Sequence, residues 1–114
     1  MRIIGENGQE AKDGDVGELA LKSWVVMEGY YKDAELTSEV LRNGWFYTGD
    51  LARRDEEGFY YIVGRKRDMI KVSGQIVFPS EVEEVMHRHP AVKEVAVVGV
   101  ADSLRGEAVR RLLF

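Results

Sequence analysis

GWFYTGDLARRDEEGFYYIVGRKRDMIKVSG, the stretch from Gly44 to Gly74, combines two apolar runs with two small polar clusters. The runs Trp45–Tyr47 and Phe59–Val63 are rich in aromatic and β-branched residues, and a charged, Gly-containing turn between them predicts a β-hairpin. The clusters Tyr47–Asp50 and Gly64–Lys71 stand at the ends of these runs. Because binding residues are often held at the ends of rigid strands, this stretch predicts a ligand site.

The residues before this stretch predict short strands and one helix. Arg2–Ile4 is a short apolar strand followed by an Asn-Gly turn, and the alternating residues around Leu19 predict a half-buried strand. Asp33–Leu41 predicts a helix with Asp33 as its N-terminal cap. Asn43-Gly44 is expected to end that helix at a left-handed residue.

The residues after Val63 change in character. Gly64–Gly74 is polar and interrupted, so it reads as a connection without regular structure. A helix is expected from Pro79, where Ser80 and Glu83 have the spacing of a capping box. Val95–Val100 is nearly continuously apolar and predicts a strand covered on both faces. The last five residues form no evident closing element.

These elements place the chain in the α+β class. Residues 1–66 predict a Gly-rich, barrel-like subdomain of β-hairpins, and residues 67–114 predict the start of a small, incomplete α/β domain. The charged connection around Arg67 lies between the two parts. A hinge is expected there.

Composition excludes several classes of function. The 114 residues carry a formal net charge of −4, which argues against a general binder of nucleic acid. The chain has no cysteine, so it has no disulfides or thiol nucleophiles, and a cytoplasmic location is expected. No apolar run approaches the roughly 20 residues of a membrane span, and the N-terminus has no signal peptide.

Three charged side chains of the central stretch are candidate ligand-binding groups. The Asp50 carboxylate has only acceptors and suits a vicinal diol such as that of ribose, or Thr-Gly-Asp is simply a turn. The Arg65 guanidinium suits a phosphate or ribose oxygen, or is a surface arginine. Lys71 is either a site ammonium or a solvated lysine. Ser73-Gly74 either lets a ligand approach the backbone closely or only forms a bend.

Two histidines are the candidates for metal binding. His87 and His89 are two residues apart on the predicted helix, so their side chains point to different faces. No further ligands accompany them. The sequence therefore predicts no metal site.

Taken together, these residues resemble the adenylate-forming superfamily, which includes acyl-CoA synthetases, firefly luciferase and the adenylation domains of peptide synthetases. The resemblance covers almost the whole chain, and the order of the motifs is more specific than any single one. The matching stretches are Gly17–Leu19, Met27–Tyr31, Gly44–Leu51, Asp55–Tyr60, Gly64–Gly74, Phe78–Glu83 and His89–Asp102.

The resemblance implies a role for each candidate residue. Asp50 would bind the ribose hydroxyls of ATP and of the acyl-adenylate, and Arg65 would contact the ribose and phosphate region. The hinge position corresponds to Arg67, where the family usually has Asp or Lys. Lys71 corresponds to a lysine that some members use in the second half-reaction, and Ser73-Gly74 would border the coenzyme A channel.

The resemblance also implies a function in fatty acid metabolism. The chain is expected to be the C-terminal portion of an acyl-CoA synthetase, a ligase that uses ATP, a carboxylic acid, coenzyme A and Mg²⁺, and to be inactive in isolation. The family's Gly-rich phosphate loop and adenine-binding segment have no counterpart in these residues. The alternative is a non-catalytic module that binds nucleotide or forms homo-oligomers through exposed strand edges.

Overall fold

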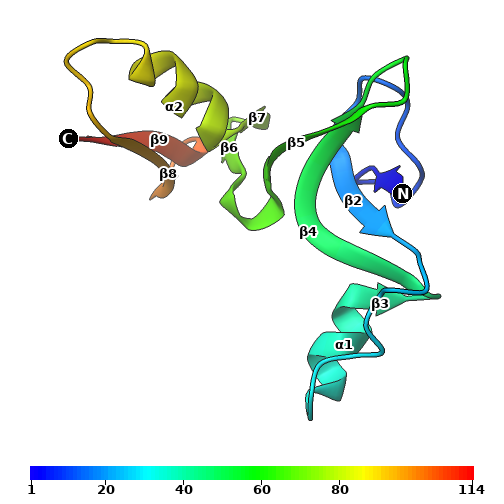
Figure 1. Cartoon of the computed structure of the whole chain (residues 1–114). Helices are drawn as coiled ribbons and strands as arrows, with labels where there is room; N and C mark the ends of the chain where they lie inside the picture. The colour runs from blue at the N-terminus through cyan, green and yellow to red at the C-terminus, as the bar shows by residue number, and fades with distance from the viewer. The chain divides into compact units, whose positions relative to one another are not determined.

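The computed structural model describes all 114 residues and divides them into two compact units, Met1–Val63 and Gly64–Phe114. Strands dominate both units, and the predicted α+β class is confirmed. The elements, in chain order, are β1 (Arg2–Ile4), β2 (Gly17–Leu21), α1 (Ala34–Val40), β3 (Leu41–Arg42), β4 (Trp45–Arg54), β5 (Tyr60–Arg65), the 3₁₀ turn η1 (Lys66–Asp68), β6 (Ile70–Val72), β7 (Gln75–Val77), α2 (Pro79–His87), β8 (Val95–Asp102) and β9 (Gly106–Leu113) (Figure 1).

The first unit is built on one sheet with the strand order β1-β2-β4-β3, and β5 also pairs with β4. The pairs β1–β2, β2–β4 and β3–β4 are all antiparallel. Ile3, Leu19 and Ala52 from three of these strands form a small buried cluster. β4 is the longest strand of the unit and curves along its length (Figure 1).

A β-bulge interrupts the pairing of β2 with β4. Glu18 faces Leu51 and Ala20 faces Tyr47, so Thr48, Gly49 and Asp50 together lie opposite the single residue Leu19. Gly49 has a φ of 75°, a conformation that glycine adopts without steric cost. A bulge bends its strand, which accounts for the curvature of β4.

Helix α1 begins as its sequence predicts but ends differently. Asp33 is confirmed as the N-cap, with its side chain accepting a hydrogen bond from the amide of Leu36. The prediction that Asn43-Gly44 ends the helix is wrong. The helix ends at Val40, and Asn43 and Gly44, with φ of 52° and 81°, form a two-residue hairpin turn between β3 and β4. Positive φ at both positions is what a type I′ turn requires, and Asn-Gly is its preferred sequence.

The second unit contains a four-stranded sheet with the order β7-β6-β9-β8. All its pairs are antiparallel, and helix α2 packs against β8. Figure 1 shows α2 lying along this hairpin of β8 and β9. Ile70 and Val97 are its buried hydrophobic residues, and Ile70 is only 1% exposed.

The expectation that 64–74 is an irregular connection is wrong. Gly64 and Arg65 end β5, the next three residues form η1, and Ile70–Val72 forms β6. Ser73 and Gly74 have φ of 50° and 80° and turn the chain directly into β7. Ile70 and Val72 alternate with Lys71, which is the signal of a three-residue strand. This alternation is too short to stand out beside the charged residues that precede it.

The predicted capping box of α2 is also wrong. The N-cap is Phe78 and makes no side-chain capping bond, while Pro79 occupies the first helical turn. Proline suits that position because its missing N–H has no partner there in any case. Glu83 instead reaches out of the helix, where its carboxylate accepts the backbone N–H of Val97 at 2.9 Å.

Two expectations for the C-terminal third are corrected. The run predicted to be covered on both faces belongs to β8, where Val97 is 5% exposed but Val98 is 42% exposed. The tail does form a regular element, because β9 pairs with β8 along its whole length. The turn between them ends at Gly106, which has a φ of 80°. Neither helix of the chain has the length and hydropathy needed to cross a membrane.

Candidate functional site

The sequence predicted that Asp50 lies at a strand end. The structure places it inside β4, in the bulge. The Thr48 hydroxyl donates to the carbonyl of Leu19 at 2.8 Å and accepts the amide of Asp50 at 3.1 Å. The carboxylate of Glu18 accepts the amide of Gly49 at 3.0 Å. These bonds replace the missing ladder bonds. They fix the backbone that carries the half-buried Asp50 side chain.

The turn after β4 is held by an ionised carboxylate. Asp55 accepts the amides of Phe59 at 2.9 Å and Glu57 at 3.0 Å, and its other oxygen accepts the Tyr61 hydroxyl at 2.9 Å. These bonds, led by that from Phe59, lower the pKa of Asp55. The same carboxylate raises the pKa of Tyr61. The turn thus joins β4 to β5 with Gly58 in the predicted left-handed conformation, at φ 89°.

The second unit contains a pocket of about 530 Å³ between η1, the start of α2 and the middle of β8. Arg65 and Arg67 both line it. Arg65 is the last residue of β5 and directly precedes η1. The Arg67 side chain is 82% exposed, with its Nε 3.8 Å from the Asp68 carboxylate. The pocket therefore presents guanidinium groups, which suit phosphate or carboxylate oxygens.

Three carboxylates line the same pocket, those of Asp68, Glu83 and Glu107, and the two glutamates accept backbone amides. Glu83 accepts the Val97 amide, as described above, and Glu107 accepts the amide of Lys71 at 2.7 Å. A Cβ atom at Gly99 would lie only 2.9 Å from the Glu107 carboxylate. At Gly99 the pocket wall is therefore formed by the backbone of β8 and by the Glu107 side chain, which lies over it.

Lys71, Ser73 and Gly74 share the β6–β7 hairpin. Lys71 is the exposed middle residue of β6, and Ser73 and Gly74 form the turn. The Ser73 amide donates to the carbonyl of Arg105 at 2.9 Å, so the turn is tied to the loop before β9. None of the three lines the 530 Å³ pocket.

The structure therefore brings the predicted residues together in two groups. Arg65 and Arg67 share a pocket, while the Lys71 hairpin lies on the same sheet as one wall of that pocket. Asp50 belongs to the first unit, and a joint ribose site of Asp50 with Arg65 remains a prediction. Sequence reasoning missed Glu107, because nothing in Gly-Glu after a turn indicates which backbone amide the carboxylate will reach.

The remaining titratable groups are arranged for local structure. The amides of Arg105 and Leu104 donate to Asp102 and lower its pKa, which holds the turn between β8 and β9. The His89 Nδ1 atom accepts the amide of Ala91 at 3.2 Å. No group of three or more His, Asp or Glu side chains is arranged to hold a metal ion.

Known proteins resemble this chain along most of its length. The family model of the AMP-binding enzyme C-terminal domain matches residues 81–112. The chain is 48% identical over 109 residues to a long-chain-fatty-acid–CoA ligase of Escherichia coli O6:H1, covering 96% of this chain and 19% of that protein. A ligase of the same name from Bacillus subtilis is 47% identical over 105 residues, again with 19% of its length covered.

Solved structures agree with these sequence matches. The o-succinylbenzoate CoA synthetase of Bacillus subtilis, in complex with an acyl-adenylate intermediate, superposes with a TM-score of 0.92 and 35% identity. The match covers 99% of this chain and 23% of that one. This chain thus spans about a fifth of the length of the curated relatives it matches.

Proposed function

Because the chain belongs to the adenylate-forming superfamily and matches the C-terminal part of its acyl-CoA ligases, we propose that it serves the two-step activation of a carboxylic acid. The acid attacks the α-phosphate of ATP to give an acyl-adenylate and pyrophosphate. The thiol of coenzyme A then attacks the acyl carbon and releases AMP. The observation that carries the proposal is 48% identity, kept over 96% of the chain, to a long-chain-fatty-acid–CoA ligase.

In the first step Asp50 and Arg65 would hold the nucleotide. The Asp50 carboxylate has only acceptors, so both hydroxyls of a ribose can donate to it. The Arg65 guanidinium would donate to ribose or phosphate oxygens and offset the negative charge that gathers on the phosphate. The hydrogen bonds of the bulge support this role, because they hold the backbone of Asp50 in place before a ligand arrives.

In the second step the β6–β7 hairpin would face coenzyme A. Lys71 would contribute its ammonium to thioester formation, and Ser73-Gly74 would border the pantetheine arm. Arg67 would be the hinge about which residues 67–114 rotate between the steps. Its place in a single 3₁₀ turn between strands supports that role, since few dihedrals need to change there.

No group of three or more His, Asp or Glu side chains in this chain is arranged to hold a metal ion. Mg²⁺ is usually bound through one or two carboxylates together with substrate phosphates and water, so it would arrive with ATP. We therefore assign no residue of this chain to Mg²⁺. ATP and AMP fit the charges of Asp50 and Arg65, and coenzyme A fits the open hairpin turn.

A hybrid enzyme tests the proposed function. The matched 109 residues of the Escherichia coli O6:H1 ligase are replaced by those of this chain. We expect the hybrid to form palmitoyl-CoA from palmitate, ATP and coenzyme A, and the purified 114-residue chain alone to form none. A folded hybrid without ligase activity, or turnover by the chain alone, would contradict this proposal.

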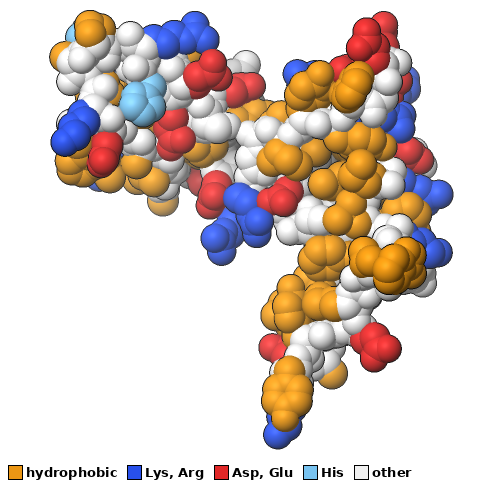
Figure 2. Space-filling view, viewed as in Figure 1, with side chains coloured by type: hydrophobic (Ala, Val, Ile, Leu, Met, Phe, Trp, Pro, Cys, Tyr) orange, Lys and Arg blue, Asp and Glu red, His pale blue; other side chains and the backbone are white.

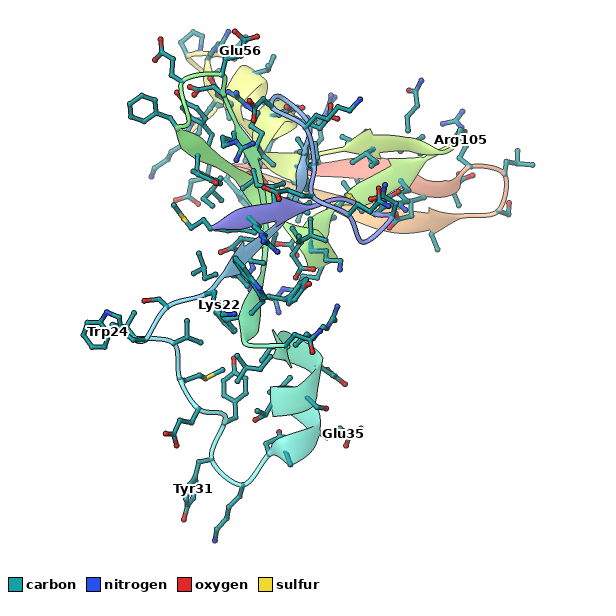
Figure 3. All side chains as sticks on the ribbon, turned by 90° about the vertical axis from the view of Figure 1, so that its right-hand side faces the viewer. Lys22, Trp24, Tyr31, Glu35, Glu56 and Arg105 are labelled. Atoms are coloured by element: carbon teal, nitrogen blue, oxygen red, sulfur yellow. The ribbon has the colours of Figure 1, made fainter.

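Variants of the hybrid test the individual roles. Asp50→Ala and Arg65→Ala should lower acyl-adenylate formation on the order of tenfold or more, because each removes a charged contact to the nucleotide. Lys71→Ala should slow thioester formation and leave adenylation near wild type. Glu56→Ala, at the exposed tip of the β4–β5 turn, is the matched control (Figure 3). Unchanged adenylation in Asp50→Ala would remove the ribose role.

A non-catalytic, self-associating module is the second candidate. It is favoured by the exposed apolar side chains of the first unit, where Trp24 is 94% exposed and Tyr31 is 89% exposed. In the second unit the edge strands β7 and β8 are available for pairing. Inactivity of the hybrid together with stable oligomers of the chain would favour this candidate.

A further inference from the structure

The pairing of β6 with β9 stops one residue before Lys71. Val72 pairs with Gly106, and a continued antiparallel ladder would set Lys71 opposite Glu107. The Lys71 amide bonds instead to the side chain of Glu107, at 2.7 Å from Oε2. A charged acceptor thus takes the place of a backbone carbonyl at this residue. Hydrogen bonds to ionised acceptors are shorter and stronger than neutral ones.

The position of the Glu107 carboxylate is set from the opposite side by Gly99. A Cβ atom on Gly99 would lie 2.9 Å from Glu107 Oε1 and 3.2 Å from Cγ1 of Ile70. A Cβ contact this short would push the end of the flexible Glu107 side chain aside, so the carboxylate can keep its present place only beside a glycine. Ile70, next to Lys71, is 1% exposed and fills the rest of that space.

The backbone of β6 is therefore held in place around Lys71, whose side chain is exposed. Because strand side chains alternate between faces, Ile70 points into the unit and Lys71 points out of it. A shift of β6 relative to β9 would re-aim the Lys71 ammonium. β6 has only three residues and one paired residue with β9, so the Glu107 bond, together with the bond from the Ser73 amide to Arg105, holds β6 against such a shift.

We propose that Glu107 is a positioning residue for Lys71: its carboxylate fixes the β6 backbone and so sets the direction in which the ammonium is presented. The inference rests on the proposed function for the role of Lys71, but the hydrogen bond itself can be tested without it. Gly99 is the second component, because it provides the room that the carboxylate needs.

Amide hydrogen exchange and NMR of the 114-residue chain test the bond directly. Glu107→Ala should speed exchange of the Lys71 amide on the order of tenfold or more and move its proton resonance upfield. Glu107→Gln keeps an acceptor oxygen and should restore part of both effects. Gly99→Ala should shift the same resonance, because the new methyl group displaces the carboxylate. Glu94→Ala, an exposed acid of the same unit, is the matched control and should leave Lys71 unchanged.

The hybrid enzyme separates positioning from general stability. Glu107→Ala should slow thioester formation as Lys71→Ala does, leave adenylation near wild type, and add nothing to Lys71→Ala in the double variant. An unchanged Lys71 amide in Glu107→Ala and Glu107→Gln overturns the proposal, as does a Glu107→Ala hybrid with normal thioester formation where Lys71→Ala is slow. If Lys71→Ala itself has no effect, the role proposed for Lys71 fails, and the amide measurement still decides whether Glu107 fixes β6.

Discussion

At the scale of single residues, Thr48 holds the bulge of β4 with one hydroxyl that both donates and accepts. It donates to the carbonyl of Leu19 and accepts the amide of Asp50. Both bonds are partly buried, so water cannot fully replace them. The local shape around Asp50 therefore depends on one side-chain oxygen atom, two bonds from the Cα atom of Thr48.

We expect Thr48→Val to destabilise the first unit by about 1–3 kcal/mol, because an isosteric methyl group leaves a carbonyl and an amide without their partner. Chemical denaturation followed by tryptophan fluorescence measures the change. Thr48→Ser retains the hydroxyl and should recover most of the stability. Equal stability of the valine and serine variants would show that the hydroxyl does not hold the bulge.

The turn carboxylate Asp55 gives the chain a defined pH dependence. Its pKa in the folded state is lower than its ordinary value of 3.8, chiefly because the Phe59 amide donates to it. Its contribution to stability is therefore complete above that ordinary value and is lost as the pH falls through the lowered folded pKa. We expect the unfolding free energy to fall as the pH drops below about 4.

Asp55→Asn should flatten that acid limb, with Glu56→Gln as the matched charge control. Asp102, whose pKa is lowered by the amides of Arg105 and Leu104, contributes with the same sign. Thermal melts at a series of pH values measure both. If the double variant Asp55→Asn with Asp102→Asn loses stability at low pH as much as the wild type does, these two carboxylates are not the cause of the loss.

The capping residues illustrate what single positions do and do not encode. Asp33 was predictable because its carboxylate bonds an amide only three residues ahead. Ser80 and Glu83 have an equally good local spacing, yet Glu83 bonds to Val97, which lies 14 residues away. Local spacing predicts a bond only when no tertiary partner competes for the side chain.

At the scale of elements, two hairpins use the same turn with different sequences. Asn43-Gly44 joins β3 to β4, and Ser73-Gly74 joins β6 to β7, with nearly equal φ values in both. Asn tolerates positive φ better than Ser, whose side chain gives less local compensation. The second turn is therefore the weaker of the two.

We expect Ser73→Asn to stabilise the second unit by roughly 0.5 kcal/mol and Asn43→Ser to destabilise the first by a similar amount. Amide exchange of the flanking strands reports on each unit separately. The two substitutions are reciprocal, so each serves as the other's control. If both substitutions change stability in the same direction, the positive φ at this turn position does not determine whether Asn or Ser is more stable there.

Elements were predictable where one strong local signal was present, as in β1, α1 and the β4–β5 hairpin. They were missed where pairing across the sheet decides the structure. β6 is only three residues long and carries a charge at its centre, and β9 has two arginines, so neither has the appearance of a strand until a neighbour supplies its hydrogen bonds.

At the scale of the whole molecule, much apolar surface is exposed. Figure 2 shows hydrophobic side chains gathered over the first unit, and Figure 3 shows Trp24 and Tyr31 projecting away from the ribbon. Their exposed fractions are 94% and 89%. Apolar side chains gathered on the surface of a chain promote association.

We expect light scattering to give a mass above the 12.9 kDa of one chain as the concentration rises. Trp24→Ser with Tyr31→Ser should reduce this association, because both side chains are exposed and apolar. Glu35→Gln, on the adjacent helix, is the control. A mass of one chain for the wild type at high concentration would contradict the expectation.

The candidate site residues remain predictions from the sequence, whereas the side chains that surround them could not be predicted at all. Asp50, Arg65 and Lys71 were identified from their types and their order along the chain. Glu107 and Gly99 lie 29 or more positions from Ile70 along the chain. They come close to it only because β6, β8 and β9 belong to one sheet. Contacts at that separation leave no local periodicity for sequence reasoning to detect.

The three-against-one bulge in β4 also limits how this chain can change its length. Side chains of a strand alternate, so the faces on which Leu51 and Ala52 lie depend on whether an odd or an even number of residues separates them from Tyr47. Loss of one residue among Thr48, Gly49 and Asp50 would exchange the inner and outer faces of the rest of β4. Loss of two would restore a continuous ladder and keep those faces, so viable insertions and deletions at this point should come in pairs.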